Sequence, residues 1–195
     1  MMFIGHVSMI FVGGQMKHKL SDITRDFPWT KVTYNGVEPW RDKGTGWFDF
    51  DIPQGWADVI YHYMIKLDAI LKKYNLVDNI IIEQVKEKFG GLRMYFIIPP
   101  HFNDDIEDYD EEFTEEQHKA IEWFQDIVWE MEEATEKVCC DCGTTEDIQC
   151  YGGWVHFACP NCEAKRVAEW KETIAEWEKV HGKIKTEDRK ENEVS

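Results

Sequence analysis

The sequence has little of what marks a membrane protein, a nucleic-acid-binding protein or an enzyme of a familiar class. No apolar run approaches the roughly 20 residues that a membrane-spanning helix needs. Lysine and arginine number 22 against 38 acidic residues, a net charge of −16, which disfavours sequence-independent binding to phosphate backbones. There is no H-E-x-x-H, no G-x-S-x-G and no phosphate-binding P-loop, and the 7 histidines are scattered. An enzyme whose groups meet only in the fold stays open.

The sequence also lacks a convincing secretion signal. Residues 1–14, MMFIGHVSMIFVGG, are apolar but have no positively charged start. Either Met16 is the true start or this stretch is a buried strand. The chain nevertheless has 6 cysteines, and without secretion we expect it in the cytoplasm, where closely spaced cysteines bind metal.

Four of these cysteines have the spacing of a structural zinc ribbon. Cys139, Cys142, Cys159 and Cys162 form two C-x2-C pairs, separated by residues 143–158. Each pair can lie on a tight turn that directs two thiolates at one ion, and four thiolates leave no coordination position for a substrate. The pattern predicts a structural Zn²⁺ whose removal unfolds this segment.

Other readings of the cysteines stay open. A disulfide pair or ordinary buried thiols would also use them, and Cys150 or His156 could replace one of the four ligands. Cys140 is left over in either case. Gly143 suits the turn after Cys142, and the pair at 152–153 suits a turn in a hairpin between the two cysteine pairs.

The apolar pattern predicts an α+β fold, with an antiparallel hairpin or small sheet packed on two or three helices and a zinc ribbon inserted. Apolar residues recur at helical spacing over 53–73. Thr114 and Gln117 match a capping box at the start of a helix that leads to the first ribbon cysteine. A final helix is expected from about Cys162 to about Val180.

These elements divide the chain into four segments. They are an α+β core (1–137), the zinc ribbon (138–163), a C-terminal helix (164–182) and a charged, disordered tail (183–195). The core begins irregularly and contains an acidic loop at 103–113. The acidic residues of 104–116 are interpreted as a solvated loop, with imitation of DNA phosphates as the alternative.

Two β-rich runs flank the pair Gly90-Gly91, which predicts a two-residue hairpin turn at these glycines. This register pairs Lys88 with Arg93 and Lys86 with Tyr95. It collects these four side chains on one face, opposite an apolar face that joins the core. The pattern therefore predicts a basic face in an otherwise acidic chain.

Opposed cations repel each other unless an anion lies between them. The protein's own carboxylates, such as Glu87 or the acidic loop, are one source. An external phosphate or carboxylate held by Arg93, with Tyr95 stacked on a ring, is the other. The predicted ligand site consists of Lys86, Lys88, Gly90, Gly91, Arg93 and Tyr95.

Three strings carry a family resemblance: G-W-A-D-V-I, E-Q-V-K-E-K-F-G-G-L-R-M-Y-F, and the cysteine motifs C-C-D-C-G and C-P-N-C. Over about residues 55–163, the chain resembles uncharacterised tailed-phage and prophage proteins with a Q-V-K-E-K-F-G-G-L-R-F-Y core and a C-terminal cysteine knuckle. Met94 stands where these proteins usually have an aromatic residue. The resemblance implies a phage setting in the host cytoplasm and no particular activity.

The sequence therefore leads to three hypotheses. The first is a non-catalytic counter-defence protein that binds a small anionic, nucleotide-like ligand at the basic face. The second is a zinc-ribbon interaction module that uses its tryptophans to inhibit a host protein. The third, less favoured, is a nucleotide hydrolase, and a homo-oligomer is left open in each case.

Overall fold

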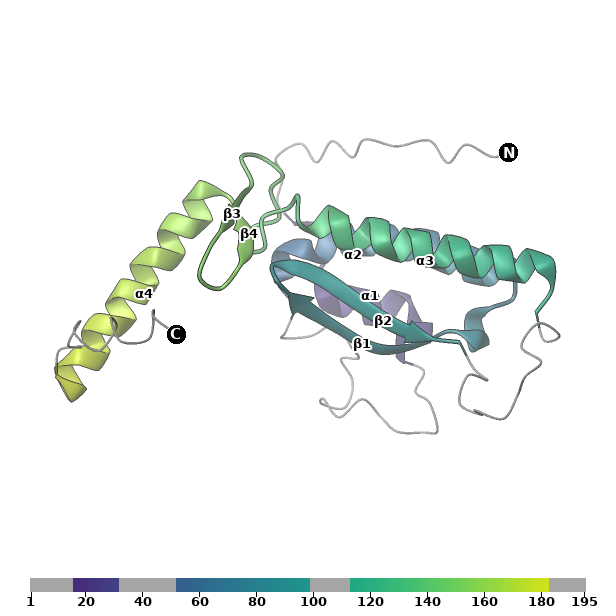
Figure 1. Cartoon of the computed structure of the whole chain (residues 1–195), viewed down its shortest axis with the longest axis horizontal. Coiled ribbons are helices and arrows are strands. Elements are labelled where there is room, and N and C mark those ends of the chain that lie inside the picture. Colours follow the sequence, from purple (N-terminus) through teal and green to yellow (C-terminus); the bar gives the residue numbers. More distant parts are fainter. Residues whose placement is uncertain (1–15, 32–51, 99–112, 183–195) are drawn as a thin grey trace, which may run out of the picture. The chain divides into compact units, whose positions relative to one another are not determined.

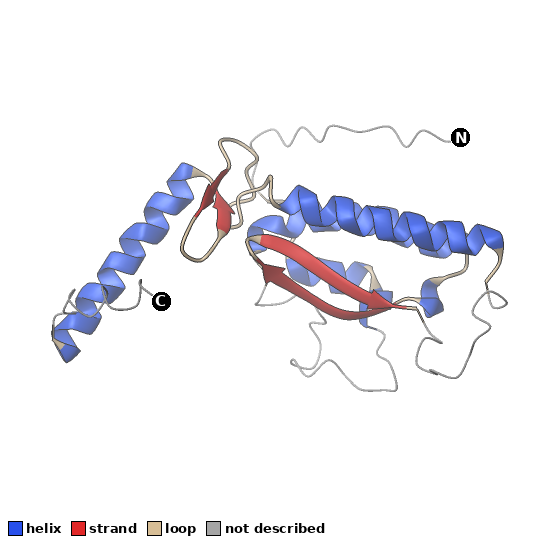
Figure 2. Ribbon diagram, in the orientation of Figure 1, coloured by secondary structure: helices blue, strands red, loops and turns tan. Residues whose placement is uncertain are grey.

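The computed structural model describes residues 16–31, 52–98 and 113–182. Two compact units, Met1–Cys159 and Pro160–Ser195, make up the chain. The first unit holds helices and two separate two-stranded antiparallel sheets, one of β1 and β2 and one of β3 and β4 (Figure 2). This confirms the predicted α+β class. The expectations for the N-terminal segment, for residues 103–112 of the acidic loop and for the tail lie outside the described residues. Glu115 and Glu116, interpreted as part of a solvated loop, lie instead in the first turn of a helix.

Helix α2 (Ala57–Lys73) forms the centre of the first unit and confirms the helix predicted over 53–73. A 3-10 turn, Gln54–Trp56, leads directly into α2, and Trp56 is fully buried. One face of α2 is buried along its length by Ala57, Val59, Ile60, Tyr63, Met64, Leu67 and Leu71. The short helix α1 (Leu20–Asp26) packs on α2, and a 3-10 turn, Pro28–Lys31, follows α1. A further 3-10 turn, Val77–Asn79, leads into the first strand.

Helix α3 (Glu115–Thr135) lies alongside α2 and against strand β2 (Figure 1). Its capping box is confirmed, because Thr114 Oγ1 accepts from the Gln117 amide at 3.2 Å and Gln117 Oε1 accepts from the Thr114 amide at 3.0 Å. Phe124 is fully buried and makes edge contacts with the rings of Trp29 and Phe96. The core therefore lies between α2, α3, the N-terminal residues 20–31 and the β1–β2 hairpin.

The hairpin consists of β1 (Ile81–Lys88) and β2 (Gly91–Ile97), and its predicted turn is wrong by one residue. The turn residues are Phe89 and Gly90, with φ angles of 55° and 81°. This is the left-handed pair that a type I′ turn requires, and for a residue other than glycine it costs about 1–2 kcal/mol. Tertiary contacts favour this turn, because Gly90 packs against strand β4 and its amide donates to Glu87 Oε1 at 2.6 Å.

The predicted faces of the hairpin nevertheless survive. Lys86 now lies opposite Arg93, and Val85 lies opposite Met94. Moving the turn by one residue changes the cross-strand partners of residues 84–88 by two, so these side chains keep their side of the sheet. A register shift between Ile82 and Gln84 ends this relation at the start of β1. Val85, Leu92 and Met94 are buried, while Lys86 and Arg93 are half-buried on the other face.

Side chains from the last turns of α3 hydrogen-bond the edge of β2. The Leu92 amide donates to Thr135 Oγ1 at 3.1 Å, and the Met94 amide donates to Glu132 Oε1 at 2.8 Å. An exposed edge of a two-stranded sheet would leave these amides to water or to another chain. Helix α3 therefore completes the hairpin as well as covering it.

The second unit contains helix α4 (Pro160–His181), which confirms the predicted C-terminal helix. None of its residues is buried, and Trp170 and Trp177 are 59% and 46% exposed. Within the described residues, no helix combines the length and the apolar character needed to cross a membrane.

Replacing Glu132 tests how its half-buried carboxylate affects folding. Burial raises the pKa of Glu132, although the Met94 amide and Arg93 oppose this effect. A raised pKa in the folded state stabilises the fold at low pH, and this contribution is lost as pH rises through the folded pKa. Glu132→Gln removes the charge and keeps an acceptor for Met94. Its urea midpoint should therefore equal or exceed that of the wild type at about pH 7, with the advantage gone at about pH 4.

Glu132→Ala is the matched variant that removes the acceptor. It should lose about 1–3 kcal/mol at both pH values, since the Met94 amide then has no partner from α3. If Glu132→Gln were less stable than the wild type only at neutral pH, attraction to Arg93 would outweigh the burial of the carboxylate.

Candidate metal centre

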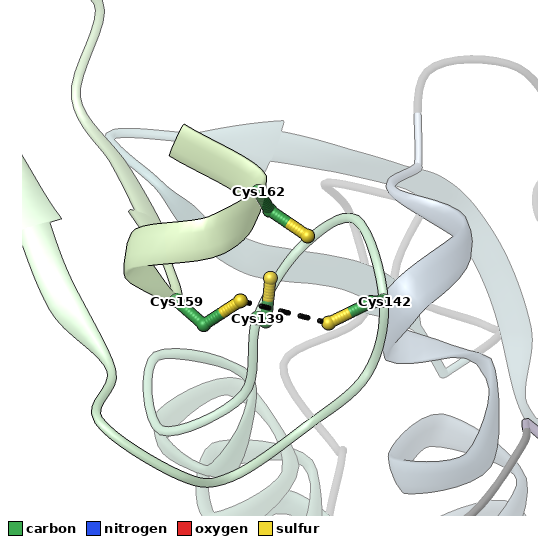
Figure 3. A group of neighbouring side chains, drawn as sticks. All are labelled: Cys139, Cys142, Cys159 and Cys162. Carbon is green, nitrogen blue, oxygen red and sulfur yellow. Dashed lines mark hydrogen bonds between the residues drawn. The ribbon is translucent and has the colours of Figure 1, made fainter. Parts of the chain in front are cut away.

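Four cysteine side chains converge after the end of α3. The sulfurs of Cys139, Cys142, Cys159 and Cys162 all lie within 4.8 Å of one another (Figure 3). Cys139 and Cys159 are buried, whereas Cys142 is exposed. The predicted set of four is therefore confirmed as a group that could hold one metal ion.

One sulfur–sulfur distance matches the edge of a tetrahedral site. Cys142 Sγ and Cys159 Sγ, joined by the dashed line in Figure 3, are 3.8 Å apart. A regular tetrahedron with metal–sulfur bonds of about 2.3 Å has edges of about 3.8 Å. Four thiolates at this spacing would fill the coordination shell of the ion.

The first pair is shaped by backbone hydrogen bonds of a tight turn. The Gly143 amide donates to the Cys139 carbonyl at 3.0 Å, and the Cys139 amide donates to the Thr144 carbonyl at 2.8 Å. Gly143 has a φ of 76°, as its predicted place in the turn requires. The chain thereby reverses between Cys139 and Cys142 and brings both sulfurs to one side.

The second pair follows a short hairpin of strands β3 (Gln149–Tyr151) and β4 (His156–Ala158). The Cys140 amide donates to the Phe157 carbonyl at 2.9 Å, which ties the first pair to β4. Cys159 comes directly after β4, and Cys162 lies in the first turn of α4. The hairpin predicted between the cysteine pairs is present.

The two alternative ligands are not part of the group. Cys150 is exposed in β3, paired with Phe157 across the hairpin. His156 Nδ1 donates to the Trp154 carbonyl at 2.7 Å, and its ring stacks with that of Tyr151. Among the residues that the structure describes, only the four predicted cysteines form such a group.

The surroundings of Cys139 favour its thiolate. Burial raises the pKa of this thiol, but the backbone amides of Cys142, Cys159 and Asp141 donate to the sulfur and outweigh burial. The net effect lowers the pKa of Cys139 to about 7. Because metals bind thiolates, a pKa near neutrality reduces the free energy needed to prepare this ligand.

Gly55 fixes the cysteine loop to the core, and sequence reasoning assigned it no role. Its amide donates to the Cys140 carbonyl at 2.9 Å. A Cβ atom at this position would lie 2.3 Å from the Cys139 carbonyl oxygen and 2.6 Å from that of Cys140. Only glycine fits here without displacing the backbone that carries the first ligand.

The residues of the predicted ligand site lie together at the hairpin, but several contact other parts of the protein. Arg93 lies 3.9 Å from Glu132 Oε2 and 3.8 Å from Glu136 Oε1, both on or just after α3. Lys86 Nζ donates to Gln84 Oε1 at 2.7 Å and lies 5.0 Å from the centre of the Tyr95 ring.

The two glycines and Lys88 of this predicted site also have close neighbours. A Cβ at Gly91 would lie 2.9 Å from both Arg93 and Glu136, and Gly90 faces Phe157. Lys88 Nζ lies 5.3 Å from the centre of the Phe89 ring. The anionic ligand stays a prediction.

Sequence reasoning missed the acids that meet Arg93. It considered Glu87 and the acidic loop, whereas Glu132 and Glu136 on and after α3 lie nearest to the guanidinium. Their spacing of one helical turn places both on one side of α3, but the sequence does not reveal that β2 lies there. No protein-family model, curated protein or solved structure matches the chain.

Replacing Gly55 tests whether the metal loop depends on the core. Gly55→Ala should lower the free energy of unfolding by about 1–3 kcal/mol, because its Cβ overlaps the Cys139 and Cys140 carbonyls. It should also weaken metal retention during dialysis against a chelator. Both effects can be measured by urea unfolding and elemental analysis of the same samples.

Gly152→Ala is the matched control, since a Cβ there meets no atom within 4 Å. It should change stability by no more than about 0.5 kcal/mol and leave metal retention unaltered. Wild-type stability and metal content in Gly55→Ala would show that the loop tolerates displacement.

Proposed function

We propose that the protein is a non-catalytic protein-binding module, in which a structural Zn²⁺ shapes a hairpin that presents Trp154. One observation carries this proposal: the four-cysteine group is joined to the β3–β4 hairpin, whose tip residue Trp154 is 80% exposed. A tryptophan that contributes so little to the core is available for contact with a partner.

Zinc is the ion that suits this ligand set best. Four thiolates in a tetrahedron are typical of structural zinc, with an iron–sulfur site as the usual alternative. The set would leave no coordination position for a substrate or a reactive water. This supports binding over metal-assisted hydrolysis.

The setting of the interaction rests on the family resemblance. Strings shared with tailed-phage proteins, in residues 55–163, support an infected bacterium as the setting. The partner would then be a host protein in the cytoplasm, and its inhibition would fit a role in counter-defence.

A small anionic, nucleotide-like ligand at the hairpin is the competing hypothesis. Lys86 and Tyr95 support it, because the ammonium lies 5.0 Å from the centre of a ring that is 42% exposed. The ion pairs of Arg93 with Glu132 and Glu136 weigh against it, since an added anion would have to replace them. Direct calorimetry with a nucleotide panel tests this hypothesis, and binding that is lost in Arg93→Ala would favour it.

The metal and the interaction can be tested in one set of variants. The purified native chain should hold about one zinc per molecule. Cys159→Ser should lose the metal, whereas Cys150→Ser, which alters a cysteine outside the group, should keep it. Used as baits in a lysate of the bacterial host, wild type and Cys150→Ser should retain a common protein that Cys159→Ser and Trp154→Ala do not retain.

The retained protein must then bind the purified zinc-loaded chain in calorimetry, with at least tenfold weaker binding to Trp154→Ala. Stoichiometric iron in place of zinc would contradict the metal assignment. A set of retained proteins that is unchanged by Cys159→Ser and Trp154→Ala would contradict the binding role.

A further inference from the structure

Phe89 is unfavourable for the folded state in two respects. It is the first residue of the β1–β2 turn with a φ of 55°, where glycine, asparagine or aspartate is preferred. Its side chain is 70% exposed, so the ring gains little from burial. A strained residue that contributes little to the core points to a role in function.

The position of this turn is fixed by the neighbouring glycine. A Cβ at Gly90 would lie 3.0 Å from Phe157 Cδ2 and 3.1 Å from His156 Cα, so the turn packs directly on strand β4. Phe89 therefore lies next to the hairpin that the cysteine group shapes. Its ring is held near Lys88, whose Nζ is 5.3 Å from the ring centre.

Trp154 lies in the turn between β3 and β4, just before the strand on which Gly90 packs. It precedes His156 by two residues, and its carbonyl accepts from His156 Nδ1 at 2.7 Å. The His156 ring in turn stacks with that of Tyr151, with ring centres 5.5 Å apart. The backbone of this turn is therefore held in place, while the Trp154 side chain is 80% exposed.

We propose that Phe89 and Trp154 are the two anchors of one protein-binding surface, and that its partner presents an apolar pocket bordered by lysine and arginine. This inference rests on the proposed function and specifies its contact residues and the chemistry of its partner. Two aromatic side chains on adjacent, backbone-fixed turns can enter a pocket with little loss of conformational freedom.

The charge of the surroundings indicates the partner. Residues 138–159 contain Asp141, Glu146 and Asp147 but no lysine or arginine. A divalent ion with four thiolates adds a dianionic complex. The last turns of α3 and the residue after it add Glu130, Glu132, Glu133 and Glu136. Lys86, Lys88 and Lys137 oppose this charge in part, while Arg93 already pairs with Glu132 and Glu136.

Such a surface attracts lysine and arginine and repels phosphates. Nucleic acids and anionic membranes are therefore disfavoured. A second copy of the chain is disfavoured as well, because it carries the same net charge of −16. A basic protein surface is the occupant that the charges favour.

The test uses a library of random displayed 12-residue peptides, selected on the zinc-loaded full chain. The enriched peptides should combine an aromatic or aliphatic residue with neighbouring lysine or arginine. Measured by fluorescence anisotropy with synthetic peptides, Phe89→Asn and Trp154→Ala should each weaken binding at least tenfold. Trp129→Ala is the matched control, since this tryptophan is 67% exposed on α3, and it should bind as the wild type does.

Thermal unfolding gives an independent readout for Phe89. Asparagine tolerates a positive φ, so Phe89→Asn should raise the melting temperature by roughly 2–4 °C while it weakens peptide binding. A lower melting temperature would mean that Phe89 serves the fold, and would overturn its assignment as an anchor.

The remaining outcomes separate the two proposals. If the zinc-loaded wild type enriches no peptide beyond those retained by Cys159→Ser, the proposed function fails. If enriched peptides need the metal but bind Phe89→Asn and Trp154→Ala normally, only the anchor surface fails. Enrichment of acidic or uncharged peptides overturns the basic partner. Two further results would assign the surface to another occupant. One is binding of a labelled oligothymidine that Phe89→Asn abolishes, and the other is a dimer in sedimentation that Phe89→Asn abolishes.

Discussion

The close approach of the cysteine loop to Gly55 links the metal group to the rest of the first unit. The Gly55 amide holds the Cys140 carbonyl, and the absence of a side chain lets the Cys139 carbonyl lie where a Cβ would otherwise be. Gly55 belongs to the turn that begins α2, and Cys139 follows the end of α3. The four-cysteine group is therefore attached to the start of α2 and the end of α3.

The β1–β2 hairpin depends on helix α3 for hydrogen bonds to one of its edges. Two strands alone are marginally stable in water, and one edge of this pair is completed by Thr135 and Glu132 from α3. At the same end of the hairpin, the turn residue Gly90 packs on β4. The two small sheets thus support each other through a helix and a turn, although no strand of one pairs with a strand of the other.

Local patterns predicted the parts of this structure that depend on neighbouring residues. The capping box at Thr114, the helix over 57–73 and the group of four cysteines that could hold a metal ion follow from spacing alone. The turn at Phe89 did not, because two adjacent glycines allow two positions and the contact of Gly90 with Phe157 decides between them. The basic and apolar faces next to the turn were still predicted correctly, because side chains alternate between the two sides of a strand.

The candidate basic face shows the limit of such reasoning more clearly. The sequence predicts Lys88 opposite Arg93, on one face with Lys86, and so calls for an anion, but it cannot say which acid lies within reach. That depends on how β2 is laid against α3, which brings Glu132 and Glu136 to the guanidinium. The packing of a helix on a strand is set by the whole core, which no single stretch of sequence specifies.

A metal ion held by the four cysteines, as proposed, would also explain how so small a hairpin can leave its aromatic residues exposed. Strands β3 and β4 have three residues each, too few to bury a core of their own. Apparent binding energies of structural zinc in small modules reach about 10–16 kcal/mol, far more than one buried aromatic ring would add. With an ion bound by the four thiolates stabilising the hairpin, Trp154 would not be needed for packing. Phe89 is in a comparable position, because the helices hold its hairpin, and the strain of its turn is small beside the burial of Leu92 and Met94.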